Sequence, residues 1–232
     1  MNLIVRLAED LMSLLFPELC QACGANLAYG EDHICTFCLF DLPYTDFHLY
    51  EDNPVAKQFW GRFYCEAAMA MLYFKKGTKV QNLIHGLKYK GQTLLGVSLG
   101  RLLGEKLRES PHFGSIDIIL PVPLHPSRQK QRGYNQSDAI AQGVSEVLAL
   151  PISVSHLLRE QVTTTQTKKA RYTRFENMQS VFVVKNAETL KNLHILLVDD
   201  VITTGATLES CSQSLLDVGI KKISIAAIAF AD

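Results

Sequence analysis

The chain has 232 residues, 47% of them hydrophobic, with 23 basic and 23 acidic side chains and a formal net charge of zero. This length suits one domain with a small appendage, and the apolar content is enough for a sizeable core. Because the charges cancel, bulk charge gives no sequence-independent grip on nucleic acid, and such binding would need a local basic patch. No apolar run is long enough to cross a membrane, and the early acids Glu9 and Asp10 argue against a secretory signal.

The first predicted element is a short amphipathic helix that ends before Pro17. Its leucines recur at helical spacing, at positions 3, 7, 11 and 14. Its simplest role is packing on a neighbouring element. A membrane-surface role has less support, because the polar face lacks a cationic cluster.

Four of the six cysteines form two C-x-x-C pairs separated by eleven residues, namely Cys20, Cys23, Cys35 and Cys38. Two such pairs bring four thiolates to the corners of a tetrahedron, which suits structural Zn²⁺ and leaves no open position for catalysis. The segment is too short to bury a core, so metal binding would supply much of its folding free energy. His33 is the rival ligand, and redox disulfides are the alternative interpretation. Without export, the cysteines indicate a reducing, cytoplasmic compartment.

The middle of the chain predicts a connector followed by helices. Residues 39–63 are mixed and aromatic, and residues 64–74 predict a pair of strands leading to a turn at 75–77. Apolar spacing then predicts helices over 80–89 and 94–107. A local basic cluster accompanies them, formed by Lys75, Lys76, Lys79, Lys88 and Lys90. A solvated helix face is a simpler interpretation of this cluster than a grip on phosphate.

A buried strand is predicted over 116–122, and it runs into a loop that carries Arg128, Lys130 and Arg132. A helix over 137–148 follows, with Ser137 as its expected N-cap. A further strand is predicted over 152–158. Residues 159–179 are polar and loop-like, with five basic and two acidic side chains, and a polar loop of this length is usually functional or disordered. A strand over 181–184 and a short turn or helix over 187–193 complete this part.

The clearest chemical signal is the stretch 195–207, ILLVDDVITTGAT. Four apolar residues predict a buried strand of a parallel sheet, with Asp199 and Asp200 following where the strand should surface. A small, hydroxyl-rich loop then leads into a helix predicted over 208–218, and a last strand is predicted over 222–230. Free N–H groups at a helix N-terminus favour phosphate, and paired carboxylates suit ribose hydroxyls or a divalent cation. The residues therefore predict a site for a sugar phosphate that carries a metal.

This stretch has three other interpretations. The plain one is a strand that ends in solvated acids, with a Thr as helix N-cap. A response-regulator receiver also opens with ILLVDD, but it needs a phosphoacceptor Asp and a Lys far downstream, and only residues 201–232 remain. An ATPase finds no support, because the sequence has no Walker-type loop.

The stretch resembles the phosphoribosyl diphosphate (PRPP) signature of type I phosphoribosyltransferases, and each position of that pattern is met. The resemblance implies an α/β fold, with a parallel sheet flanked by helices. It implies that Asp199 and Asp200 contact the ribose hydroxyls of PRPP, which binds with Mg²⁺. It assigns the 5-phosphate to Val201, Thr203, Thr204, Gly205, Ala206 and Thr207.

Two other segments take roles from the same resemblance. The basic loop stands where the family binds pyrophosphate, which Arg128, Lys130 and Arg132 would neutralise. The long polar stretch stands where the family has a flap that closes over PRPP, with candidate contacts Lys168, Lys169 and Arg171. The alternatives are a solvated loop for the first segment and an inert loop for the second.

The order of motifs along nearly the whole chain looks like the competence protein F family of bacteria. LIHGLKYKG, RQKQRGYNQS and TTTQTKKAR look like that family's own motifs. The resemblance implies a zinc-binding segment over 1–45, a connector and helical hood over 46–114, and a phosphoribosyltransferase-like core over 115–232. It implies transfer of phosphoribosyl from PRPP to an unidentified acceptor, and a role in DNA uptake. A PRPP or nucleotide sensor without turnover and a single-stranded-DNA-binding component of the uptake machinery are the alternatives.

Overall fold

The computed structural model describes residues 17–89, 92–160 and 182–231. Its centre is a parallel sheet of four strands in the order β1 (Ala67–Tyr73), β6 (Lys222–Phe230), β5 (His194–Ile202) and β2 (Ile118–Pro121). Each neighbouring pair of strands is parallel. The strands are almost entirely buried, as expected for a parallel sheet that is covered on both faces. The predicted α/β class with a parallel sheet is confirmed.

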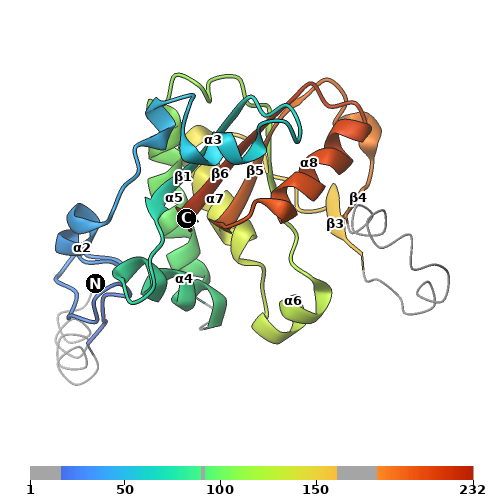
Figure 1. Ribbon diagram of the computed structural model, residues 1–232. Helices are drawn as coiled ribbons and strands as arrows, with labels where there is room; N and C mark the ends of the chain where they lie inside the picture. Colours follow the sequence, from blue (N-terminus) through green and yellow to red (C-terminus); the bar gives the residue numbers. More distant parts are fainter. Residues whose placement is uncertain (1–16, 90–91, 161–181, 232) are drawn as a thin grey trace.

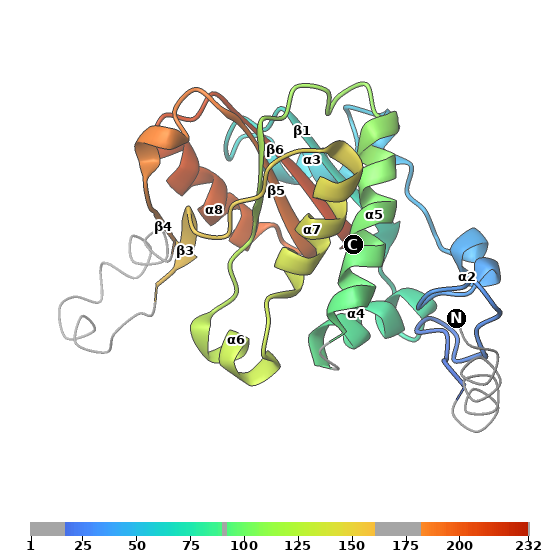
Figure 2. The same cartoon turned by 180° about the vertical axis from the view of Figure 1, so that it is seen from behind.

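Helices cover both faces of this sheet. The two long helices α5 (Thr93–Glu109) and α7 (Gln136–Leu148) pack side by side on one face, and α3 (Pro54–Phe59) and α8 (Ala206–Asp217) lie on the other (Figures 1 and 2). No helix in the described ranges combines the length and the apolar character that a membrane span requires.

Helices α5 and α7 approach closely because glycines face each other. A Cβ atom added at Gly100 would lie 2.1 Å from the Ile140 carbonyl oxygen, and one added at Gly143 would lie 2.1 Å from the Val97 carbonyl oxygen. Only hydrogen fits at these two positions without a backbone shift. The close contact fixes α7 against α5, and the N-terminal end of α7 forms part of the site described below.

Shorter elements surround this core. They are α2 (Thr36–Asp41), η1 (Phe47–Leu49), α4 (Lys79–Tyr89), α6 (Pro126–Arg132), β3 (Leu157–Arg159), β4 (Phe182–Val184) and η4 (Ala187–Thr189). Strands β3 and β4 pair with each other in a separate antiparallel sheet. In both views α2 and the β3–β4 pair lie at opposite ends of the molecule (Figures 1 and 2).

The predicted strand pair over 64–74 is wrong. The chain forms one strand there, β1, and it pairs with β6, whose residues lie more than 150 positions later. Local periodicity cannot reveal such a distant partner. The strand predicted over 152–158 is also largely wrong, since Ile152 makes a single bridge to Ile119 and Leu157 pairs instead with Val184 of β4.

Two local predictions around α7 and β5 also need correction. The N-cap of α7 is Asn135, whose side-chain oxygen accepts a bond of 3.2 Å from the Ser137 amide, so Ser137 lies inside the helix. The basic segment before it is helical over α6 rather than a loop. Strand β5 does not surface at Asp199, because pairing with β6 continues to Ile202. The helices predicted over 80–89, 94–107 and 208–218 and the last strand are confirmed.

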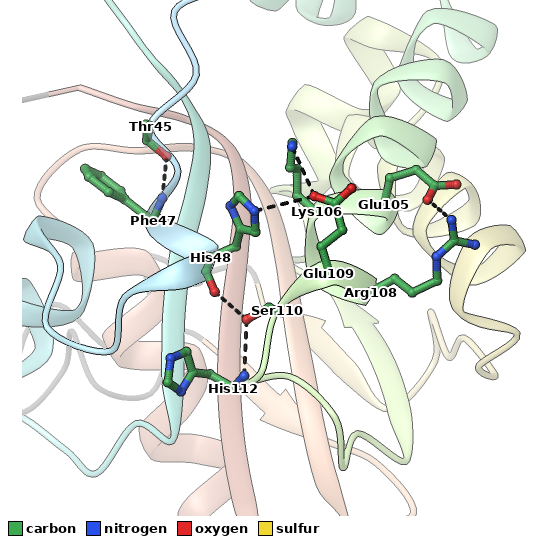
Figure 3. Close-up of polar contacts among 9 residues, drawn as sticks. All are labelled: Thr45, Phe47, His48, Glu105, Lys106, Arg108, Glu109, Ser110 and His112. Atoms are coloured by element: carbon green, nitrogen blue, oxygen red, sulfur yellow. Dashed lines mark hydrogen bonds and ion pairs between the residues drawn. The ribbon is translucent and has the colours of Figure 1, made fainter.

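The segment before β1 is tied to the C-terminal end of α5 (Figure 3). His48 is only 3% exposed, and its carbonyl oxygen accepts a hydrogen bond from the Ser110 hydroxyl. Its ring Nε2 lies 3.7 Å from a carboxylate oxygen of Glu109, which Lys106 also contacts at 3.1 Å. Burial, and then the charge of Lys106, lower the pKa of His48. The buried ring therefore favours its neutral form.

Candidate functional site

A cavity of about 350 Å³ opens at the carboxyl edge of the main sheet. Because all four strands run in the same direction, their C-terminal ends meet at this edge, where ligands bind in open α/β sheets. Phe74 follows β1, Ala231 follows β6, and Pro123 follows β2, and all three line the cavity. The carboxylates Asp199 and Asp200 enter it from β5.

The two carboxylates are held by the N-terminal end of α7. The Ser137 hydroxyl donates to Asp199 Oδ1 at 3.0 Å, and the Gln136 amide donates to Asp200 Oδ2 at 3.2 Å. The backbone N–H of Asp200 also donates to Asp199 Oδ1, at 2.8 Å. Asp200 is only 5% exposed. These bonds fix the direction of both carboxylates without using all of their acceptor capacity.

A cation from α4 completes this arrangement. Lys88 Nζ lies 3.0 Å from Asp200 Oδ2, and Lys88 lines the cavity. The end of α4 is also held by Tyr134, whose hydroxyl donates to the Leu87 carbonyl oxygen. A charge-assisted bond to a buried carboxylate is among the stronger polar contacts in proteins.

The pKa of Asp199 is raised from 3.8 to about 7. Burial is the largest cause, and the negative charge of Asp200 is the next. The Asp200 amide, the Ser137 hydroxyl and Lys88 lower the pKa but offset only part of this. The pair therefore resists carrying two charges near neutral pH. A ligand that brings positive charge or hydroxyl donors would favour the doubly ionised form.

A second, smaller cavity of about 50 Å³ adjoins the first. It is lined by the loop between β5 and α8, and Asp199, Val201, Thr203 and Thr207 line both cavities. Gly205 is the N-cap of α8 and has a φ of +73°, a conformation that favours glycine. The first turn of a helix has free N–H groups and the positive end of the helix dipole, so this small cavity suits an anion.

The cavity brings together most, not all, of the residues expected at the site. The acids and the loop residues lie at the two cavities, and Arg128 and Arg132 line the larger one. Lys130 is exposed on α6 and is not among the lining residues. Lys168, Lys169, Arg171 and the predicted helix before Pro17 lie outside the described residues.

The lining residues that the sequence does not reveal as part of the site include Lys88, Gln136, Ser137 and Arg159. Lys88 belongs to LIHGLKYKG, but its cluster was interpreted as a solvated face. Gln136 and Ser137 belong to RQKQRGYNQS, in which only the cations are expected to contact a ligand. The distinctive motifs were the available signal, and the geometry explains why they contain these residues.

The four N-terminal cysteines form one cluster. The Sγ atoms of Cys20, Cys23, Cys35 and Cys38 all lie within 4.8 Å of one another. Gly24 and Gly30 have φ values of +79° and +85° and make the turns of the segment. No other group of metal-ligating side chains is found in the parts of the chain that the structure describes, and His33 is not in the cluster. Four converging sulfurs fit an ion that prefers thiolates.

Backbone amides favour the thiolate at Cys20, whereas burial and the neighbouring cysteines raise the pKa of Cys38. Burial raises the pKa of Cys20, but hydrogen bonds from the amides of Cys35, Cys23 and Ala22 outweigh it and lower the pKa to about 6. The Cys35 amide donates to Cys20 Sγ at 3.3 Å, and the Cys38 amide donates to Cys35 Sγ at 3.4 Å. Hydrogen bonds from backbone amides to sulfur orient the sulfur atoms and delocalise the charge of metal-bound thiolates.

Comparison with known proteins identifies a domain family and relatives that span most of the chain. Residues 136–232 match the phosphoribosyl transferase domain family. Competence protein F of Haemophilus influenzae is 31% identical over 220 residues, covering 92% of this chain and 85% of the relative. DNA utilization protein YhgH of Escherichia coli K12 is 29% identical over 228 residues, covering 91% of this chain and 96% of the relative.

Solved structures are more distant. The glutamine PRPP amidotransferase of B. subtilis, complexed with ADP and GMP, aligns with a TM-score of 0.45 and 15% identity, covering 62% of this chain and 30% of that chain. The assignment therefore comes from the sequence relatives and the domain match. By this similarity the chain belongs to the competence protein F (ComF/YhgH) family, with a phosphoribosyltransferase domain over residues 136–232 and a four-cysteine cluster before it.

Proposed function

We propose that this protein binds PRPP with Mg²⁺ in the cavity at the carboxyl edge of the sheet and transfers its phosphoribosyl group to an acceptor, releasing pyrophosphate. One observation carries the proposal. Asp199 of the anchored carboxylate pair and Thr203 and Thr207 of the following loop line two adjoining cavities, and Asp200 lines the larger of the two. A pentose with a phosphate on its 5-position needs hydroxyl acceptors beside an anion site.

Each of these groups has a role in this proposal. Asp199 and Asp200 accept hydrogen bonds from the ribose hydroxyls, and the loop Thr203–Thr207 holds the 5-phosphate through backbone N–H and hydroxyl groups. Arg128 and Arg132 face the diphosphate. Mg²⁺ that arrives with PRPP supplies further neutralisation of its charge. As the glycosidic bond breaks, positive charge develops on the ribose, and the two carboxylates stabilise it.

Residues beyond the described cavity also belong to the proposal. We assign Lys130, Lys168, Lys169 and Arg171 to the diphosphate as further cations. The four-cysteine cluster takes structural Zn²⁺, because four thiolates satisfy its tetrahedral preference.

The names of the relatives point to DNA uptake, and we propose that this protein serves that process. Direct contact of the cysteine segment with DNA is disfavoured. Residues 17–56 contain seven acids and no Lys or Arg, so this segment would repel a phosphate backbone. Chemistry on PRPP is therefore the better-supported contribution, rather than a zinc-mediated grip on single-stranded DNA.

Two measurements test the proposal. Titration calorimetry with PRPP and Mg²⁺ should show binding to the wild type, and Asp200→Asn should abolish it. Asp217→Asn removes the same charge from an exposed position on α8 and should bind as the wild type does. Release of pyrophosphate with a panel of nucleobases then separates an enzyme from a sensor. Wild-type protein that does not bind PRPP, or an Asp200→Asn variant that binds it normally, would contradict the proposal.

A further inference from the structure

The loop that lines the small cavity is contacted from behind by a distant part of the chain. The Gln58 side-chain amide donates to the Thr203 carbonyl oxygen at 2.9 Å, and Arg62 Nη1 donates to the Thr204 carbonyl oxygen at 3.1 Å. Gln58 lies in α3 and Arg62 just after it, more than 140 positions before the loop. Helices α3 and α8 lie on the same face of the sheet (Figure 1).

These two bonds determine which way the loop's amides point. In a trans peptide the C=O of one residue and the N–H of the next point in opposite directions. Since the carbonyls of Thr203 and Thr204 are turned toward α3, the N–H groups of Thr204 and Gly205 are turned away from it. Both Thr204 and Gly205 line the small cavity. The contacts from α3 therefore present two donors to an anion.

An apolar contact supports the same turn. Phe59 of α3 is fully buried, and a Cβ atom added at Gly205 would lie 2.9 Å from its ring. The Phe59 ring thus packs directly beneath the residue that begins α8. Arg62 also pairs with Glu209 in the first turn of α8, at 3.1 Å. The loop and the helix start are held by one short segment, 58–62.

We propose that Gln58 and Arg62 are positioning residues for the 5-phosphate of PRPP, an inference that rests on the proposed function. They touch the loop rather than the substrate. Both lie outside the part of the chain that matches the phosphoribosyl transferase domain. A loop of small residues has many accessible conformations, and ordering it before the ligand arrives reduces the entropy lost on binding. The connector before β1 is thereby part of the binding machinery.

The test compares ligands that do and do not reach the loop. The double variant Gln58→Met/Arg62→Met removes both donors while keeping the length of the side chains. We expect its affinity for PRPP with Mg²⁺ and for ribose 5-phosphate to fall at least tenfold. Its affinity for inorganic pyrophosphate with Mg²⁺ should not change, because pyrophosphate does not use the loop. Arg62 is exposed and Gln58 is half-buried, so the variant should fold.

Two controls sharpen the result. Arg62→Lys keeps a cationic donor and should recover part of the lost affinity relative to Arg62→Met. Lys57→Met alters the same helix but removes a pair with Asp52 and a contact with the Trp60 ring, neither of which involves the loop, and should bind as the wild type does. Unchanged affinity for ribose 5-phosphate in the double variant, or an equal loss for pyrophosphate, would overturn the inference. Wild-type protein that binds none of these ligands would instead overturn the proposed function.

Discussion

Asp199→Asn should stabilise the protein while it removes a predicted ligand-binding group. The carboxyl titrates at a pKa of about 7 in the folded protein against 3.8 in the unfolded chain. Because its folded-state pKa is raised, the folded protein holds this proton more tightly, and stability is lost as pH rises through this window. At about 1.4 kcal/mol per pH unit, the loss reaches at most ~4 kcal/mol above pH 7.

Asparagine has the size of aspartate and no charge, so the variant avoids this loss. Its Oδ1 atom can still accept from the Ser137 hydroxyl and the Asp200 amide, which bond Asp199 in the wild type. The free energy of unfolding of variant and wild type should be similar near pH 4. As pH rises from 4 to about 7, the free energy of unfolding of the variant should exceed that of the wild type by about 1 kcal/mol more for each pH unit. Above about pH 7 this difference should level off.

Urea denaturation of both proteins from pH 4 to pH 8 measures this difference. Asp217→Asn serves as the matched control, because it removes a carboxylate from an exposed position at the end of α8. The control should show no comparable pH-dependent gain. A stability difference between Asp199→Asn and wild type that stays flat across this range would refute the reasoning, as would a variant that is less stable at pH 8.

Three further predictions concern the ligand, the metal and the helix contact. Affinity for PRPP with Mg²⁺ should fall as pH drops below about 7, by an amount that approaches tenfold per pH unit, because Asp199 takes up a proton. Calorimetry at several pH values measures this affinity. An affinity that does not change with pH would count against the role of this carboxylate. Purified protein should contain about one equivalent of zinc per chain, and Cys38→Ser should lose it while Cys65→Ser, outside the cluster, retains it; elemental analysis decides. Gly143→Ala should destabilise the protein by about 1–3 kcal/mol or more in denaturant titration, because its Cβ would meet the Val97 carbonyl, whereas Gly114→Ala enters open space and should have little effect.

The sequence predicts those features whose residues lie close together along the chain. The strand, the two acids, the loop and the following helix occupy one continuous stretch, so periodicity and residue type were enough to place them. The four cysteines were predictable for the same reason, since their spacing carries the geometry of the cluster.

The features that the sequence does not predict depend on contacts between residues far apart along the chain. The partners of Asp200 lie 64 residues away at Gln136 and more than a hundred away at Lys88, and no local pattern pairs them. The hydrogen bonds from Gln58 to Thr203 and from Arg62 to Thr204 are long-range contacts of the same kind. Strand β1 was misjudged because its partner is the most distant strand in the described chain. The boundaries predicted at 45/46 and 114/115 stay predictions.

The position of β6 has a consequence for synthesis. This strand lies between β1 and β5, yet it follows both along the chain. When synthesis has reached the end of α8, both β1 and β5 have been made, but β6, which lies between them in the sheet, has not. Until β6 leaves the ribosome, β1 has no partner in the sheet, and its apolar edge is open to association with other chains. Deletion of β6 should consequently give an aggregating product rather than a smaller stable domain.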